Sequence, residues 1–380
     1  MNEARTYRLA TIPGDGVGPE VVAAARHVLD TAGRQFGFAI EWTDVTAGGI
    51  AIDTFGVAIR PEDVETCRAA DAVLLGAVGG PRWDDPNAPV RPEQALFALR
   101  GGLGLFANLR PVTVHPALVP ASPLRPDLLE GVDLLIVREL TGGIYFGPRE
   151  EASGAPGELV ARDTLPYSEP EVRRVVRLAF ELARGRQRRL TSVDKANVLA
   201  TSRLWRTVVE DVRGEFADVE VGHQLVDSCA MLLVKKPAAF DVLVTENLFG
   251  DILSDEASIL AGSLGMLPSA SLGERRTAHG IFGLYEPIHG SAPDIAGRDL
   301  ANPIGTILSG AMLLRWSLGR PDVADAIEAA VGAVLDDGLR TADLVRSGET
   351  PVGTQAMAHA IGERIAITGA ASAAPIAART

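Results

Sequence analysis

Two aspartates, Asp251 and Asp255, lie four residues apart, directly after an apolar segment at 240–245. Residues with this spacing share one face of a helix, so their like charges would repel each other. A hard divalent cation would remove that repulsion, and carboxylate oxygens are the ligands that Mg²⁺ prefers. The pair is also typical of a solvated helix start, where the macrodipole favours aspartate, and that is the commoner case.

Three arginines, Arg100, Arg110 and Arg138, are candidates for binding a substrate with two carboxylates. Arg138 follows an apolar run at 134–137 that is typical of a buried strand. A side chain directly after a strand lies near the edge where open α/β sheets bind ligands, and guanidinium groups bind carboxylates through paired hydrogen bonds. For each arginine alone, a surface ion pair is the usual case.

Lys195 and Tyr145 are candidates for proton transfer. Lys195 follows an apolar run at 190–193, and a lysine buried beside a metal ion can act as a base near neutral pH. Tyr145 lies in the glycine-rich loop 142–147, where a tyrosine in a polar pocket can donate a proton. Either residue alone is more often structural than catalytic.

Two further stretches concern nucleotide binding. Residues 13–19 (PGDGVGP) match neither the dinucleotide fingerprint nor the phosphate loop in spacing. Residues 286–294 (EPIHGSAPD) form a compact polar loop whose backbone N–H groups and His289 could contact a nucleotide. Asp294 could accept hydrogen bonds from ribose hydroxyls, and its charge would repel a 2′-phosphate, which favours NAD over NADP.

Short β-prone runs alternate with helical patterns along the chain. The strand pattern covers residues 7–12, 39–45, 72–77, 134–137, 190–193, 219–225 and 242–245, and the helical pattern begins at Pro19 and recurs at 170–184, 202–215, 252–260, 311–318 and 323–335. This alternation predicts an α/β fold with a parallel or mixed sheet. The segment 142–166 interrupts it, and indicates either a surface loop or a β-arm that pairs with a second subunit.

Composition limits the classes of function. The chain has 380 residues, a formal net charge of −13 and a pI of about 5.0, so we expect no general binding of nucleic acid or of anionic membranes. Its length predicts two domains or lobes. Cys67 and Cys229 are too few and too far apart for a disulfide framework. No run is typical of a signal peptide or a membrane span, so we expect a cytoplasmic location.

Eight stretches in order along the chain resemble the β-decarboxylating dehydrogenase family of isocitrate and isopropylmalate dehydrogenases, and in particular its isopropylmalate branch. They are GDGVGPE at 14–20, LLGAVGGPRWD at 74–84, LFANLRP at 105–111, VRELTGGIYFG at 137–147, SVDKANVL at 192–199, NLFGDILSDEAS at 247–258, GSLGMLPSASLG at 262–273 and EPIHGSAPDIAG at 286–297. Each motif alone is weak, but their combination and order are highly specific.

The resemblance implies a two-lobed α/β fold with a mixed sheet that is not a Rossmann fold. Residues 1–105 and 262–380 would form an NAD-binding lobe. Residues 106–261 would form a lobe for metal binding, substrate binding and dimerisation, with an arm near 142–166 where the family has its intersubunit clasp. Because the family builds each active site from two chains, the resemblance also implies a homodimer.

The resemblance further implies roles for individual residues. Asp251 and Asp255 would bind Mg²⁺ or Mn²⁺ together with a second copy's Asp227, which would also contact the substrate. The three arginines would hold the substrate carboxylates. Lys195 would reach across from the second copy as the base, and Tyr145 would protonate the enolate left by decarboxylation. The cofactor-binding positions, for NAD, would be Glu93, His289, Gly290, Ser291, Ala292, Asp294, Ile295 and Asn302.

The implied reaction is oxidation and decarboxylation of a hydroxy diacid, (2R,3S)-3-isopropylmalate, to 4-methyl-2-oxopentanoate with reduction of NAD, as in leucine biosynthesis. Leu96, Phe97 and Val198 favour an apolar substituent, because isocitrate enzymes need a polar group for the extra carboxylate. Phe97 stands where leucine is common, so another alkyl- or arylmethyl-malate, or tartrate or malate in a paralogous pathway, stays open. A regulatory subunit without turnover would have lost site residues, and none is lost.

Overall fold

The computed structural model describes residues 5–85, 88–346 and 348–372, and the chain divides into two compact units. The first unit comprises Met1–Gly104, His115–Ala121 and Ala261–Thr380, and the second comprises Leu105–Val114 and Ser122–Leu260. The chain therefore leaves the first unit and returns to it, so residues distant in sequence build a common core there.

The strands of the first unit lie in the order β2-β1-β3-β12-β11. The first four run parallel, whereas β11 is antiparallel to β12. Every residue of β3 is buried, as expected for a strand that is covered on both faces. The bounds are β1 (Arg5–Gly14), β2 (Phe38–Asp44), β3 (Ala72–Ala77), β11 (Pro268–Arg276) and β12 (Ile281–Pro287).

Helices α1 (Gly18–Phe36) and α10 (Ile304–Trp316) pack against this sheet and against each other, and α11 (Pro321–Asp336) and α12 (Thr354–Ser372) pack on them. Helix α1 has proline in its first turn and ends at Gly37, which adopts the left-handed conformation that glycine reaches without strain. The remaining helices of the unit are α2 (Gly49–Phe55), α3 (Pro61–Ala69) and α4 (Gln94–Leu103).

The strands of the second unit lie in the order β4-β5-β10-β8-β9. All but β4 run parallel, and β4 is antiparallel to β5. The bounds are β4 (Leu105–Thr113), β5 (Asp133–Glu139), β8 (Arg189–Asp194), β9 (Glu220–Leu225) and β10 (Val242–Thr245).

Four main helices complete the second unit: α6 (Glu169–Arg184), α7 (Ala200–Arg213), α8 (Val226–Lys235) and α9 (Asn247–Ser258), with a short α5 (Pro126–Leu129). Helix α6 connects β5 to β8 and α7 connects β8 to β9, so both crossovers run toward the β9 edge of the sheet. Helix α8 connects β9 back to β10, in the opposite direction. Right-handed crossovers therefore place α8 on the face opposite α6 and α7. Helix α9 packs against α8 and β5.

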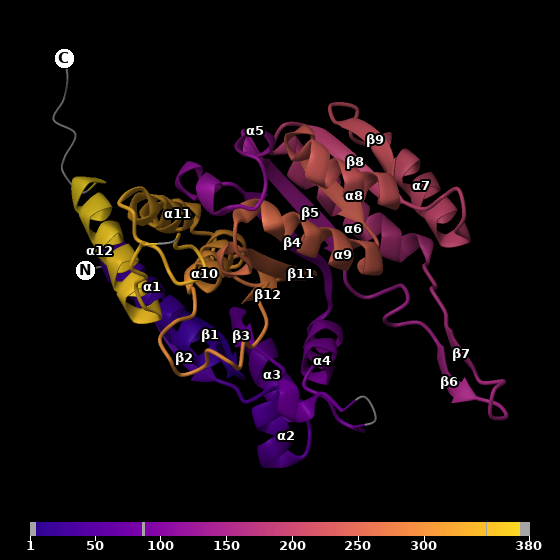
Figure 1. Ribbon diagram of the computed structural model, residues 1–380, viewed down its shortest axis with the longest axis horizontal. Coiled ribbons are helices and arrows are strands. Elements are labelled where there is room, and N and C mark those ends of the chain that lie inside the picture. The colour runs from indigo at the N-terminus through magenta and orange to yellow at the C-terminus, as the bar shows by residue number, and fades with distance from the viewer. Residues whose placement is uncertain (1–4, 86–87, 347, 373–380) are drawn as a thin grey trace. The chain divides into compact units, whose positions relative to one another are not determined.

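The segment that breaks the α/β alternation contains a two-stranded antiparallel hairpin, β6 (Arg149–Ser153) and β7 (Val160–Asp163). All residues of both strands are exposed. The hairpin extends away from the sheet of its unit (Figure 1). The segment is thus a β-hairpin rather than an irregular loop, and its pairing with a second subunit stays a prediction.

The predicted α/β class with a mixed sheet is confirmed. The strands β4, β11 and β12 were not predicted, and residues such as Asn108, Arg110 and Pro111 break the apolar pattern of β4. Helix α9 begins at Asn247 rather than at 252, since Glu246 caps it by accepting hydrogen bonds from the Leu248 and Phe249 N–H groups.

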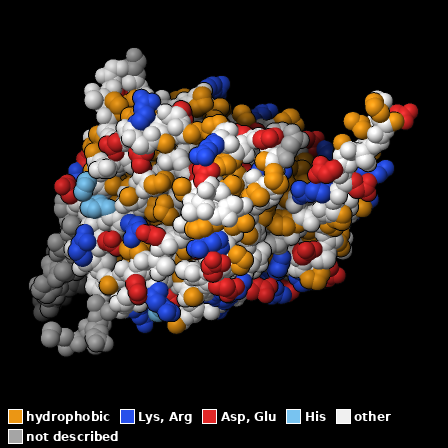
Figure 2. Space-filling model, turned by 90° about the horizontal axis from the view of Figure 1, so that it is seen from below, with side chains coloured by type: hydrophobic (Ala, Val, Ile, Leu, Met, Phe, Trp, Pro, Cys, Tyr) orange, Lys and Arg blue, Asp and Glu red, His pale blue; other side chains and the backbone are white. Residues whose placement is uncertain are grey.

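The surface of the molecule carries charges of both signs. On the face drawn in Figure 2, acidic and basic side chains are interspersed, and the projecting hairpin carries both signs. Among the described residues, no helix is long and apolar enough to cross a membrane.

Candidate active site

The parallel strands of the second unit end at one edge, and most of the predicted site residues of this unit lie there. Arg138 is the second-to-last residue of β5, and Lys195 directly follows β8. Asp227 follows β9, and α9 begins after β10. This edge is where open α/β sheets bind ligands. The fold thus explains why these residues, spread over more than a hundred positions, belong to one region of the unit.

Arg138 makes a buried charged contact at this edge, with a side chain that is 3% exposed. Its Nε donates to the backbone oxygen of Asn247 at 3.0 Å, its Nη2 donates to Asn247 Oδ1 at 2.8 Å, and its Nη1 donates to Asp251 Oδ1. The Arg138 stem also occupies the space that a Cβ at Gly250 would need. Arg138 therefore fixes the start of α9 as well as facing Asp251.

Arg110, on β4, faces the next turn of the same helix. Its Nε donates to Asn108 Oδ1 at 2.7 Å, and its Nη1 donates to Ser254 Oγ at 2.6 Å and to Asp255 Oδ1 at 3.1 Å. Its Nη2 lies 3.9 Å from Asp251 Oδ1. Two guanidinium groups thus face the two aspartates of one helix face and offset their mutual repulsion.

Tyr145 completes this group, because its Oη donates to Asp251 Oδ2 at 2.9 Å. Burial, with the hydrogen bond to Asp251 adding to it, raises the pKa of Tyr145 to about 12. The phenol is therefore protonated at neutral pH, as a proton donor must be.

Lys195 and Asp227 form a separate pair, with Lys195 Nζ 2.6 Å from Asp227 Oδ1. The hydrogen bond from Lys195 lowers the pKa of the exposed Asp227 carboxyl. Asp227 does not join Asp251 and Asp255, because within the described residues no three His, Cys, Asp or Glu side chains are grouped so that they could hold one metal ion.

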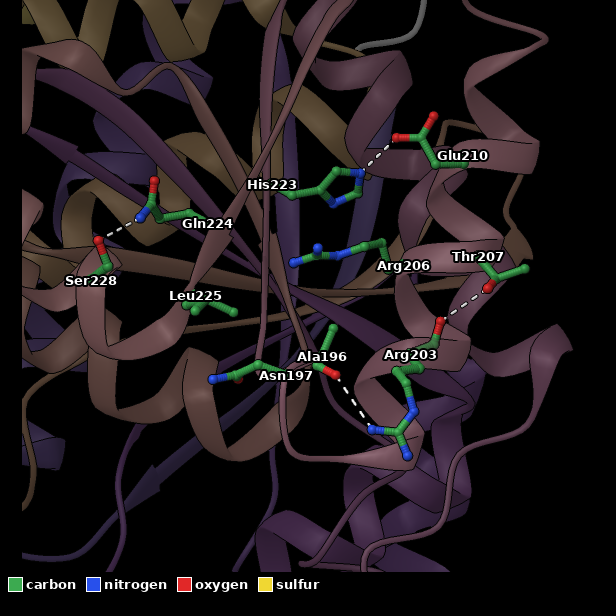
Figure 3. Close-up of a pocket in the computed structure, with 10 residues that line it drawn as sticks. All are labelled: Ala196, Asn197, Arg203, Arg206, Thr207, Glu210, His223, Gln224, Leu225 and Ser228. Carbon is green, nitrogen blue, oxygen red and sulfur yellow. Dashed lines mark hydrogen bonds and ion pairs between the residues drawn. The ribbon is translucent and has the colours of Figure 1, made fainter.

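A pocket of about 940 Å³ adjoins this pair, lined by residues of the loop after β8, of α7, of β9 and of the first turn of α8. Figure 3 shows His223 facing Glu210, with 2.6 Å between His223 Nε2 and Glu210 Oε1. Arg206, beside it, donates twice to the buried Asp194 carboxylate. Asp194 also accepts the Ala196 N–H, so the Arg206–Asp194 pair fixes the backbone next to Lys195.

The first unit carries the other predicted substrate residues on α4. Arg100 Nη2 lies 3.3 Å from Glu286 Oε1, and both side chains are largely buried. Leu96 is half-buried, and Phe97 is 41% exposed. Val198, which belongs to the second unit, is 62% exposed. These exposures leave apolar side chains available for a ligand.

The loop after β12 carries most of the predicted nucleotide residues. His289 Nδ1 contacts the Gly290 oxygen at 2.9 Å, its Nε2 is a buried atom without a hydrogen-bond partner, and burial lowers its pKa. Ala292 has a φ of +37°, which is strained for a residue with a Cβ. Asp294 is exposed. A neutral ring, a strained turn and an exposed carboxylate suit a loop that contacts a ligand.

Two other predicted cofactor residues are placed differently. Asn302 is buried, and its side-chain amide donates to Asp343 Oδ2 at 3.0 Å and accepts from the Ile304 N–H at 3.0 Å, so it holds the segment directly before α10. Glu93 is exposed and precedes α4. The structure therefore gives Asn302 a structural role, to which nucleotide binding would be an addition.

The glycine-rich turn 13–19, which matched no phosphate motif, supports this nucleotide loop. The Val17 N–H donates to the Ser291 oxygen at 2.8 Å, and Val17 packs with Val21, Ala301 and the partly buried Ala292, Ile295 and Ala296. Asp15 accepts the N–H groups of Gly49, Ile50 and Gly79. Glu20 accepts those of Gly297 and Asp299. The turn and the first residues of α1 thus hold together three segments, at 49–50, at 79 and at 291–299.

The sequence did not single out several residues that hold the site. Asn247 and Ser254 are the direct partners of Arg138 and Arg110, and Glu286 is the partner of Arg100. All three lie inside stretches that resemble the family, which was the available signal. Their roles depend on contacts over more than a hundred residues, which no spacing rule reveals.

Comparisons with known proteins give one consistent result. A family model described as isocitrate/isopropylmalate dehydrogenase matches residues 8–361. The chain is 57% identical to a 3-isopropylmalate dehydrogenase of Anaeromyxobacter dehalogenans over 94% of this chain and 99% of that protein. It is 56% identical to a 3-isopropylmalate dehydrogenase of Moorella thermoacetica over 93% of this chain and 98% of that protein.

Solved structures agree with these sequences. An isocitrate dehydrogenase from Methylococcus capsulatus superposes with a TM-score of 0.82 at 35% identity, over 95% of this chain and 99% of that one. A β-decarboxylating dehydrogenase from Thermococcus kodakarensis superposes with a TM-score of 0.76 at 37% identity, over 98% and 100%.

Proposed function

Since the chain belongs to the isocitrate/isopropylmalate dehydrogenase family, we propose that it oxidises (2R,3S)-3-isopropylmalate with NAD and decarboxylates the product to 4-methyl-2-oxopentanoate, a step of leucine biosynthesis. The observation that carries this proposal is the identity of 54–57% to relatives of that name over nearly the whole chain. The family as such consists of β-decarboxylating dehydrogenases, and this chain is one of them.

Substrate binding is assigned to the three arginines. Arg110 and Arg138 each have a largely buried guanidinium at the edge of the second unit, and a planar guanidinium can hold a carboxylate through two hydrogen bonds. Arg100 of the first unit is proposed to bind a substrate carboxylate as well. Each arginine has a carboxylate partner in the chain itself, so the bound diacid has to share or replace those contacts.

The residues present fit Mg²⁺ or Mn²⁺. Asp251 and Asp255 offer hard carboxylate oxygens from one helix face, with Asp255 exposed and Asp251 partly so. We assign the third carboxylate to Asp227 of a second copy, because among the described residues this chain's own Asp227 is not grouped with Asp251 and Asp255. When bound, the metal would polarise substrate oxygens and NAD would accept the hydride.

Two side chains are assigned to proton transfer. The Lys195 amine of the second copy, or a water that it orients, would take the proton from the substrate hydroxyl. Tyr145 would give a proton to the enolate that remains after loss of CO₂. The raised pKa of Tyr145 supports the second role, because the phenol holds its proton until it meets a stronger base such as an enolate carbon.

NAD is assigned to the loop after β12. Exposed Asp294 could accept hydrogen bonds from a ribose, and its charge would repel the 2′-phosphate of NADP. Gly290, Ser291, Ala292 and Ile295 would contact the cofactor from the same loop, and Glu93 and Asn302 from its neighbours. The test is the ratio of NAD to NADP turnover, and equal rates would remove the Asp294 argument.

A homodimer is part of the proposal, and an exposed apolar surface on α8 and α9 supports it. These helices pack together and expose Met231 by 64%, Val234 by 43% and Ile252 by 58%, and Ile259, directly after α9, is 48% exposed. Several exposed apolar side chains on two packed helices are typical of an interface. Both helices begin at the edge of the sheet where the site residues lie. A second copy that packs on them could therefore contribute its Lys195 and Asp227 to the site.

The experiment that tests the proposed function is an assay of the purified protein with Mg²⁺, NAD and a panel of 3-substituted malates. We expect 3-isopropylmalate to have the highest kcat/KM, because the apolar Leu96, Phe97 and Val198 are the residues that the family resemblance assigns to an apolar wall for the malate substituent. Preference for isocitrate would refute that wall, and preference for an arylmethyl- or another alkylmalate, tartrate or malate would move the chain to the paralogous alternative. Absence of turnover with every member would favour the regulatory subunit. A cytoplasmic location is proposed with the pathway.

A further inference from the structure

A partly buried tyrosine that the mechanism does not use lies next to the loop of Tyr145. Tyr167 directly follows Pro166, and its ring occupies the space next to the Gly142–Gly143 turn. A Cβ added at Gly142 would lie 2.5 Å from the ring, and one added at Gly143, where φ is +76°, would lie 2.7 Å from the hydroxyl. The turn that leads to Tyr145 therefore rests directly on Tyr167.

The Tyr167 hydroxyl also reaches the first residue of α9. Its Oη accepts the Asn247 N–H at 3.0 Å and lies 3.1 Å from Glu139 Oε2 and 3.4 Å from Glu246 Oε2. Asn247 in turn donates from its side-chain amide to the Gly142 oxygen at 3.2 Å and accepts from Arg138. One hydroxyl thus touches the turn that carries Tyr145 and the helix that carries Asp251.

Two buried carboxylates complete the network. Glu139 accepts the N–H groups of Thr141 and Gly142, which hold the start of the turn, and Glu246 caps α9. Burial and the neighbouring carboxylates raise the pKa of Tyr167, so its hydroxyl keeps a proton to donate to them. Glu139 and Glu246 lie where the turn meets the helix. Without the hydroxyl proton of Tyr167, these two carboxylates would lose a hydrogen-bond donor that offsets the repulsion between their charges.

We propose that Tyr167 is a positioning residue: its hydroxyl sets the Gly142–Gly143 turn against the start of α9 and thereby holds Tyr145 in hydrogen-bond contact with Asp251. This inference rests on the proposed proton transfer by Tyr145. It assigns Tyr167 no contact with substrate or cofactor, so its effect passes through the 2.9 Å bond between Tyr145 Oη and Asp251 Oδ2.

The test is a double-mutant cycle with Tyr167→Phe and Tyr145→Phe. Tyr167→Phe keeps the ring under the turn and removes only the hydroxyl. We expect its kcat to fall by about tenfold while the KM for the hydroxy diacid changes by less than about twofold, since Tyr145 acts after binding. In the Tyr145→Phe background the same change should cost less than about twofold, because the group it positions is gone.

A matched control is Tyr285→Phe, which removes the hydroxyl of a fully buried tyrosine of the first unit, 2.7 Å from Ser317 Oγ. It should lower the Tm much as Tyr167→Phe does and leave kcat unchanged. A second variant, Gly143→Ala, displaces the turn while keeping the Tyr167 hydroxyl, and should show the same loss of kcat and the same non-additivity.

The proposal would be overturned if the kcat losses of Tyr167→Phe and Tyr145→Phe were independent, so that the loss in the double variant equals their product. An unchanged kcat in Tyr167→Phe would overturn it as well. A change in KM alone would do so too. Failure of the proposed function is a different result, because it appears already in the wild-type chain, which would then not turn over 3-isopropylmalate. The cycle would still be measurable with whichever malate of the panel the wild-type chain oxidises.

Discussion

Arg138 illustrates, at the scale of single residues, how one side chain serves both the fold and the site. Its guanidinium donates to Asn247 and to Asp251 from a buried position, and its stem fills the space above Gly250. A lysine cannot make such a planar fork, although it keeps the charge.

Arg138→Lys should therefore raise the KM for the hydroxy diacid by about tenfold or more and lower the free energy of unfolding by about 1–3 kcal/mol. Steady-state kinetics and chemical denaturation measure the two effects. The control is Arg177→Lys, since Arg177 pairs with Glu215 on the surface and should change stability by less than about 0.5 kcal/mol. Equal effects of the two substitutions would contradict the role given to Arg138.

Tyr145 gives a prediction for pH. Burial first, and the bond to Asp251 second, raise its pKa to about 12 from the usual 10. Because the folded-state pKa is the higher one, the stability linked to the neutral phenol is present below pH 10 and is lost as the pH rises toward 12. The ultraviolet titration difference between wild type and Tyr145→Phe should show a phenol ionising near 12. A difference centred near 10 would mean that Tyr145 is not held against Asp251.

Glu20 shows what an element adds to the site. It lies in the first turn of α1 and accepts the N–H groups of Gly297 and Asp299, at the end of the loop assigned to NAD. The helix thus anchors a loop that follows nearly three hundred residues later, and the glycine-rich turn before it supports the loop's other end through Val17 and Ser291.

Glu20→Gln leaves one acceptor oxygen and brings an NH₂ group against a backbone N–H. We expect the Kd for NAD, measured by calorimetry, to rise by about three- to tenfold, while the KM for the hydroxy diacid stays the same. Glu328→Gln, which alters an exposed partner of Arg315 on α11, is the control and should leave both constants unchanged. A parallel rise of both constants in Glu20→Gln would show a general loss of structure instead of a loosened loop.

For the whole molecule, the central question is whether each site needs two chains. Lys195 and Asp227 pair with each other, whereas Arg110, Arg138 and Tyr145 gather around Asp251 and Asp255. If the two groups meet only across a dimer, two defective variants can complement each other.

Lys195→Ala and Asp251→Asn should each be nearly inactive as homodimers. After joint unfolding and refolding, about half of the dimers are mixed and each has one intact site, so about a quarter of the wild-type activity should return. Mixing without unfolding is the control. No recovery, although mixed dimers are detected by mass, would show that Lys195 serves its own chain.

The apolar surface of α8 and α9 supplies the matching structural test. Ile252→Glu places a charge on this surface without touching the arginines, and should shift the protein to a monomer in analytical ultracentrifugation with loss of activity. Val57→Glu, at an apolar position of the first unit with similar exposure to Val234, should stay dimeric and active. A dimeric, active Ile252→Glu would place the interface elsewhere.

The sequence alone determined the α/β class and the family, because these follow from β-prone runs, helix periodicity and eight ordered motifs. The alternation left a parallel or a mixed sheet open, and the mixed sheet was implied only by the resemblance to the family. It also identified the charged residues at the strand ends. It missed β11, β12 and β4, in the last of which polar residues and proline break the pattern, and it began α9 late because Glu246 caps it.

Only the tertiary structure decided which of those residues meet. Arg138 and Tyr145 donate hydrogen bonds to Asp251, and Arg110 donates one to Asp255. Asp227 pairs with Lys195 and not with the other two aspartates. It also gave the glycine-rich turn its role in holding other segments together and brought Tyr167 next to the Tyr145 loop. The physical reason is that a motif records the chemistry of one short segment, whereas a hydrogen bond between segments exists only where packing brings their backbones together.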